Sequence, residues 1–199
     1  MTPRAAGPTI TSVPRSPLLA VGGLALVAVA MVLVAQRTGD DGPAAHPLGT
    51  EVLVGHEDVS GGAPGVRTQI GLTVLAVRRG TQEELAANGL EVDDDARDAT
   101  PYYVDARYAN RGERAVKRNL SVGLEDTDGD LMGRTLIFGL GAGEPFAPCP
   151  RVLEGTLEPG ESYESCTLVL VPDGVDVGRV HFLSTSPGEE PEFVYWATE

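Results

Sequence analysis

Hydrophobic and polar residues follow two different patterns along this chain. Residues 18–35 (LLAVGGLALVAVAMVLVA) form one apolar run without a charge. Beyond about residue 50, apolar residues instead alternate with polar ones in short stretches. A run of about 18 apolar residues is long enough for a helix that spans a bilayer, whereas alternation with a period of two is typical of strands with one buried face. The pattern therefore predicts one transmembrane helix followed by an all-β domain.

The charges that flank the apolar run set its expected orientation. Arg4 and Arg15 precede the run and Arg37 follows it. Basic residues favour the cytoplasmic side of a membrane, so residues 1–17, rich in Pro, Ser and Thr, are expected to form a disordered cytoplasmic tail. The rest of the chain is then exported, as a single-pass membrane protein whose C-terminal domain is extracytoplasmic.

A cleaved signal peptide is the alternative to an uncleaved anchor. Signal cleavage needs small residues just before the cut. Residues 33–35 (LVA) and 43–45 (PAA) fit this requirement only in part. In that case the chain would be a secreted protein. No cysteine lies near the end of the run, which excludes a lipoprotein anchor.

Residues 36–49 contain Gly, Pro and Asp without apolar periodicity and are predicted to be a linker. Residues 50–199 then form one extracellular domain. One short helix is expected at residues 82–88, capped by Thr81 and ended by Gly89. The alternation in residues 68–78 places Ile70, Leu72, Val74 and Ala76 on one face of a strand. The full set of predicted strands is 51–54, 68–78, 102–109, 120–124, 131–138, 151–157, 163–171, 178–184 and 193–197.

Turn signals separate these stretches. Pro159 and Gly160 occupy one turn and Gly129 another, between runs of β-branched and apolar residues. The last stretch contains Trp196, which we expect to pack in the core because aromatic side chains bury large areas. About eight or nine short strands with frequent turns are typical of an antiparallel β-sandwich.

Four segments carry a resemblance to a known family. They are residues 103–112 (YVDARYANRG), 124–130 (LEDTDGD), 157–161 (LEPGE) and 170–172 (LVP). In this order they resemble a bacterial family of exported immunoglobulin-like sandwiches, grouped with immunoprotective extracellular antigens and domains of unknown function. The resemblance covers roughly residues 66–196. It implies an immunoglobulin-like fold and an exported location, but no reaction, because such folds have many roles.

Composition narrows the choice of compartment and partner. The net charge is −14, and an acidic domain is a poor candidate for binding nucleic acid. The chain has two cysteines, Cys149 and Cys166, both after the apolar run. In an exported protein an even pair is best explained by a disulfide bond.

One segment of the acidic domain is basic. Five positive charges fall within twelve residues: Arg107, Arg111, Arg114, Lys117 and Arg118. These side chains can simply pair with neighbouring acids at the surface. The functional alternative is a docking patch for an acidic cell-surface protein or an anionic wall polymer.

Asp126, Asp128 and Asp130 alternate like the carboxylates of a calcium loop, and are weak candidates for metal ligands. The spacing does not match an EF-hand, in which Gly is at position six and Glu at position twelve. A β-turn whose side chains face water explains the same residues. The sequence predicts no cofactor.

No catalytic constellation stands out in the sequence. The three histidines are His46, His56 and His181, and neither a G-x-S-x-G nor an S-x-x-K motif occurs. The sequence therefore predicts a protein that is not an enzyme and has a binding or assembly role at the cell surface. An enzyme with an unrecognised acidic site and a purely structural spacer remain the alternatives.

Overall fold

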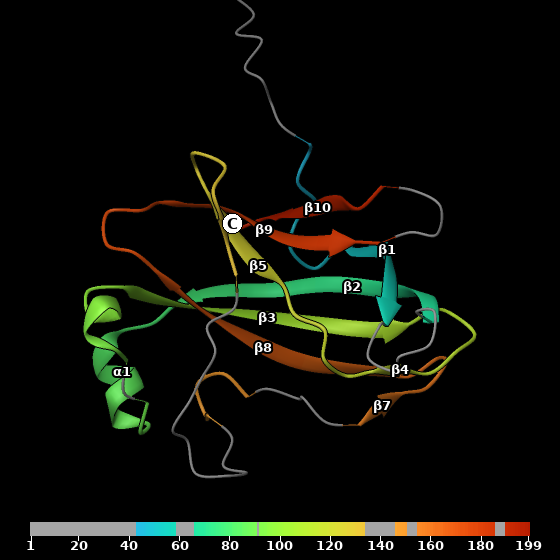
Figure 1. Ribbon diagram of the computed structural model, residues 1–199, viewed down its shortest axis with the longest axis horizontal. Coiled ribbons are helices and arrows are strands. Elements are labelled where there is room, and N and C mark those ends of the chain that lie inside the picture. Colours follow the sequence, from blue (N-terminus) through green and yellow to red (C-terminus); the bar gives the residue numbers. More distant parts are fainter. Residues whose placement is uncertain (1–42, 59–65, 91, 134–145, 151–154, 186–189) are drawn as a thin grey trace, which may run out of the picture. The chain divides into compact units, whose positions relative to one another are not determined.

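The computed structural model describes residues 43–58, 66–90, 92–133, 146–150, 155–185 and 190–199 (Figure 1). Within these ranges it contains strands, one short α-helix and one 3₁₀ turn (Asp94–Ala96). The helix α1 is Gln82–Ala87. The strands are β1 (Glu51–Asp58), β2 (Val66–Arg79), β3 (Thr100–Asn110), β4 (Val116–Lys117), β5 (Gly123–Asp126), β6 (Leu131–Met132), β7 (Thr156–Leu157), β8 (Ser162–Val171), β9 (Val177–Ser184) and β10 (Glu192–Ala197).

The strands form antiparallel sheets, so the all-β prediction is confirmed. One four-stranded sheet has the order β1-β2-β3-β8 and is called the first sheet below. The other has the order β10-β9-β5-β6 and is called the second sheet. Strands β4 and β7 pair separately; β4 was not predicted, because two residues are too short for an alternation to be visible.

The inner faces of the two sheets share one hydrophobic core, which is the arrangement of a β-sandwich. Trp196 is fully buried, as expected. Hydrogen bonds also tie the sheets at one edge, where the Gly55 and Glu57 amides donate to the hydroxyls of Ser184 and Thr185. The buried apolar members of this core are Val54, Ile70, Leu72, Val74, Val104, Ala106, Tyr108, Val116, Leu120, Val122, Leu124, Leu157, Tyr163, Val169, Val171, Val180, Phe182 and Trp196.

A β-bulge in β2 corrects one expectation. Val74 pairs with Ala106, but Ala76 pairs with Asp105, so one extra residue, Leu75, lies between them. Neighbouring residues of β3 point to opposite faces, which places Ala76 on the outer face. Val77 packs against the core in its place. The prediction that Ala76 shares a face with Val74 is therefore wrong, because a bulge shifts the alternation by one residue.

The predicted helix begins at Gln82 as expected and ends at Ala87, one residue earlier than expected, with Asn88 as its C-cap. Thr81 accepts a hydrogen bond from the Glu84 amide as the N-cap, and Gly89 follows the helix with φ of 76°. Among the described residues no helix is long and apolar enough to cross a membrane. The predicted transmembrane helix at 18–35 and the predicted tail at 1–17 lie outside the described residues, as do residues 36–42 of the linker and most of the predicted strands at 131–138 and 151–157.

Residues 43–49, which the sequence assigns to the linker, are packed on the domain. His46 forms a parallel bridge with Trp196: its amide donates to Tyr195 O and its carbonyl accepts from the Ala197 amide, each at 2.8 Å. The Gly49 amide donates to Val74 O of the first sheet. This segment therefore connects the edge strand β10 to the first sheet, and the folded domain begins by Pro43 rather than at residue 50.

Candidate functional site

The disulfide between Cys149 and Cys166 is confirmed. Their Cα atoms lie 5.0 Å apart, and each cysteine is 2% exposed. Cys166 lies in β8 on the outer face of the first sheet, and the Cys166 amide donates to Pro150 O. The bond therefore fixes the segment 146–150 onto this face.

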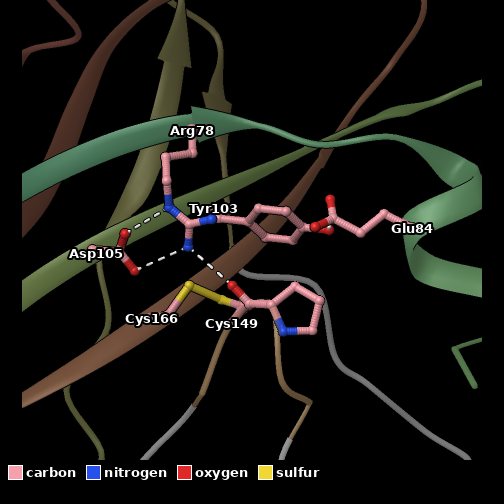
Figure 2. Close-up of a disulfide and its surroundings, with 7 residues drawn as sticks. Arg78, Glu84, Tyr103, Asp105, Cys149 and Cys166 are labelled. Atoms are coloured by element: carbon pink, nitrogen blue, oxygen red, sulfur yellow. Dashed lines mark hydrogen bonds and ion pairs between the residues drawn. A yellow bond between two sulfur atoms is a disulfide. The ribbon is translucent and has the colours of Figure 1, made fainter. Parts of the chain in front are cut away.

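A second apolar cluster lies beneath the disulfide. Tyr103 and Phe146 pack there with Leu85 of helix α1. Arg78 points toward Asp105 (Figure 2), with Nε 2.9 Å from Asp105 Oδ2, and its Nη2 also donates to Pro148 O at 2.9 Å. One half of the outer face of the first sheet is thus covered by α1 and by residues 146–150, which we call the stapled segment because the disulfide fixes them there.

Tyr103 connects this cluster to helix α1. Its hydroxyl donates to Glu84 Oε2 at 3.1 Å (Figure 2). Burial, together with this hydrogen bond, raises the pKa of Tyr103 to about 12. The phenol therefore stays protonated near neutral pH, as a donor to Glu84 must be.

The basic segment begins at a buried asparagine. Asn110 ends β3 and is 1% exposed. Its Nδ2 donates to Arg114 O (2.7 Å) and Leu157 O (2.9 Å), and its Oδ1 accepts from the Gly112 amide (3.0 Å) and the Thr68 hydroxyl (3.3 Å). One side chain thus fixes the shape of the loop that carries Arg111 and Arg114, with Asn110 and Gly112 two positions apart at its start.

Arginines of the basic segment form ion pairs on the surface. Arg107 pairs with Glu164 (2.7 Å), Arg111 with Glu51 (2.8 Å) and Arg118 with Glu161 (3.4 Å). Arg114 and Lys117 are exposed as well. Neighbouring glutamates therefore balance the charges of Arg107, Arg111 and Arg118.

The Arg111–Glu51 pair lies flat across β2. Arg111 Nε donates to Glu51 Oε1 at 2.9 Å and Nη2 donates to Oε2 at 2.8 Å, the two-pronged geometry that guanidinium and carboxylate prefer. A Cβ atom at Gly71 would meet Glu51 Oε1 at 2.5 Å, so the pair occupies the space that this glycine leaves open. The hydrogen bond from Arg111, with the charges of Arg111 and Arg107, lowers the pKa of Glu51.

Pairs of this kind contribute little to stability. Arg107, Arg111 and their partners are between 39% and 59% exposed, and exposed ion pairs contribute about 0–1 kcal/mol. Their arginines can therefore exchange an internal carboxylate for one on a partner at a small free-energy cost.

The acidic residues Asp126, Asp128 and Asp130 form the turn between β5 and β6. Asp126 Oδ1 accepts from the amides of Asp128 and Asp130, and Gly129 has φ of 93°. Within the described ranges no group of three or more His, Cys, Asp or Glu side chains could hold a metal ion. These contacts assign the carboxylate of Asp126 to shaping the turn.

An ion pair that sequence reasoning missed lies beside this turn. Arg179 Nη2 is 2.6 Å from Glu125 Oε1, and the guanidinium carbon lies 3.7 Å from the centre of the Tyr195 ring. Arg179 Nη1 also donates to Pro43 O at 3.0 Å. A pocket of about 540 Å³ adjoins it, open to solvent and lined by 43–45, 125–129, Gly178 and Arg179. These contacts fix Pro43, the first described residue, against the second sheet. The sequence contains one sign of this ion pair, which is the charged Glu125 within an otherwise apolar strand.

His181 lies on the outer face of the second sheet. Its ring lies over Gly123 and meets Phe193 edge-on, with ring centroids 5.2 Å apart. Burial lowers the pKa of His181, against the opposing effects of the Met132 and Leu124 backbone and of the Glu125 charge. Burial thus favours the neutral imidazole in the folded domain.

This environment makes stability depend on pH. We expect the free energy of unfolding to fall as pH drops from about 6.5 toward the lower pKa of folded His181, because the unfolded chain binds the proton there and the folded domain does not. A His181→Phe variant removes this contribution and keeps an aromatic ring beside Phe193. Urea unfolding of the variant and the parent at several pH values measures this contribution. We expect the free energy of unfolding of the parent to fall more on acidification than that of the variant. Equal falls in the two proteins would contradict a lowered pKa of His181.

Together these features define a class of protein: an all-β domain of two packed antiparallel sheets, stapled by a disulfide, with an arginine-rich surface. No protein-family model matches the chain, and no curated protein matches it. Among solved structures, it is similar to MPT63, a secreted protein from Mycobacterium tuberculosis, with a TM-score of 0.49 and 16% identity over 79% of this chain and 98% of that one. It is also similar to the yjhA protein from Bacillus subtilis, with a TM-score of 0.44 and 14% identity over 76% of this chain and 98% of that one. Neither similarity bears on what this chain binds.

Proposed function

We propose that the chain is an extracytoplasmic immunoglobulin-like domain with a non-enzymatic binding or assembly role at the cell surface, anchored in the membrane by a helix at residues 18–35. The observation that carries this proposal is the buried Cys149–Cys166 bond. Structural disulfides persist in oxidising compartments and are rare in the cytosol. The uncharged apolar run that precedes the domain supplies the route of export.

The binding role rests on the loop after Asn110. Four hydrogen bonds hold a buried asparagine in place, so Arg111 and Arg114 are presented by a fixed backbone. A fixed loop loses little conformational entropy on binding, which favours recognition. The guanidinium fork of arginine suits carboxylates and phosphates, so the partner is expected to offer one of these groups, as an acidic cell-surface protein or an anionic wall polymer does.

Crosslinking in intact cells, followed by purification of the chain, tests this role. We expect the parent to capture a reproducible partner and a variant with Arg111→Ser and Arg114→Ser to lose it. The matched control carries Arg79→Ser and Arg97→Ser, two exposed arginines near helix α1, and keeps the partner. Equal capture by both variants would exclude this loop as the binding surface, and no capture by the parent would contradict the binding role.

A further inference from the structure

Among the described residues, only half of the outer face of the first sheet is covered. Helix α1 and the stapled segment lie over the half that carries Tyr103 and Cys166. The other half carries two ion pairs and one exposed apolar side chain: Glu51, Leu53, Arg107, Arg111 and Glu164. We call these five residues the arginine–glutamate face. Leu53 is 59% exposed, more than any other large hydrophobic side chain among the described residues.

The charges of this face are balanced and interleaved. Arg107 and Glu164 come from neighbouring strands, and Arg111 reaches across β2 to Glu51. The charge of Arg107 also acts on Glu51, because it contributes to lowering the pKa of that carboxyl. Positive and negative groups thus alternate across the sheet from β1, the edge strand that carries Leu53, to β8, and a uniformly charged polymer would meet repulsion at half of them.

A surface of this kind is complementary to itself. When two identical faces meet about a two-fold axis, the contact of residue i with residue j occurs twice, so arginines of one copy can face glutamates of the other. Leu53 adds exposed apolar area beside the Arg111–Glu51 pair, and buried apolar contact is a usual part of a protein interface. The whole chain carries a net charge of −14, so two copies repel each other at most other places.

The first described residues of the chain pack on the second sheet. Residues 43–46 contact β10 and Arg179 there, so this segment does not cover the arginine–glutamate face.

We propose that the partner bound at this surface is a second copy of the chain, docked through the arginine–glutamate face, with the Arg111–Glu51 pairs exchanged between copies and Leu53 beside them. This inference rests on the proposed binding role and names its partner.

Cysteine crosslinking of the full-length chain in its own membranes tests the inference. A Leu53→Cys variant is expected to give a covalent dimer under mild oxidation. The controls are Leu131→Cys and Leu183→Cys, which replace leucines of similar exposure (48% and 46%) on the second sheet. We expect several-fold more dimer at position 53 than at either control. Equal yields at all three positions, or no dimer at position 53, would overturn the inference.

Charge reversal supplies the second measurement. In the Leu53→Cys background, Arg111→Glu alone and Glu51→Arg alone are each expected to lose the dimer, because each places like charges across the two-fold axis. Co-expression of the two variants should restore it as a mixed dimer; absence of the mixed dimer would overturn the exchange of pairs.

The outcomes separate this inference from the proposed function. Capture of a different protein through Arg111 and Arg114, without a Leu53→Cys dimer, overturns self-association and leaves the binding role standing. Loss of both signals overturns both.

Discussion

Replacing Asn110 with alanine is expected to lower the free energy of unfolding by about 3 kcal/mol and to abolish partner capture. The side chain makes four hydrogen bonds while 1% exposed. Each such bond contributes roughly 1 kcal/mol, and a buried group left unpaired costs about as much or more. The carbonyls of Arg114 and Leu157 would lose their donor, so the loop would also lose its fixed shape.

Chemical unfolding of three variants measures this effect. Asn119→Ala is the matched control, because Asn119 is exposed in the same segment, and its effect should stay within about 0.5 kcal/mol. Asn110→Asp keeps the size and shape but turns an oxygen toward the two carbonyls, so it should be at least as destabilising as alanine. A stable Asn110→Asp domain would show that the donated hydrogen bonds are not what holds the loop.

Removal of the disulfide is the second large effect. A Cys149→Ala, Cys166→Ala double variant is expected to lose about 3 kcal/mol, because the bond closes a loop with a sequence separation of 17 residues and a loop of this size restricts the unfolded chain by that amount. For a domain of this length the loss corresponds to a fall in Tm of about 6–12 °C. The loosened segment would also uncover Tyr103 and Leu168.

Thermal unfolding with and without reductant tests this prediction. The Tm of the parent should fall by the same amount when its disulfide is reduced and the thiols are alkylated. The Tm of the double variant should not change with reductant. A parent whose Tm is unchanged after complete alkylation would contradict a stabilising role for the bond.

Local signals in the sequence predicted much of the fold. Thr81 and Gly89 mark the ends of α1 because capping depends on neighbouring residues. Gly129 permits the turn after β5 for the same local reason. Most strands were found because alternation is a property of one segment, and the disulfide because the chain has two cysteines.

The remaining features depend on contacts between distant segments. The extra residue Leu75 in β2 becomes visible only when β3 pairs beside it. Arg111 lies 60 positions from Glu51, and Arg179 lies 54 from Glu125. Asn110 signals a turn in the sequence, but its acceptor Leu157 O is 47 positions away. The basic segment was therefore predicted as a cluster, while its neutralisation by glutamates required the structure.

The location of the domain is the most direct test of this account, and the chain has one lysine with which to measure it. Lys117 lies in β4 and is exposed. A membrane-impermeant amine reagent applied to intact cells should label Lys117, and a Lys117→Arg variant should lose the label on this residue. Labelling of Lys117 only after the cells are lysed would place the domain inside the cell and contradict the account.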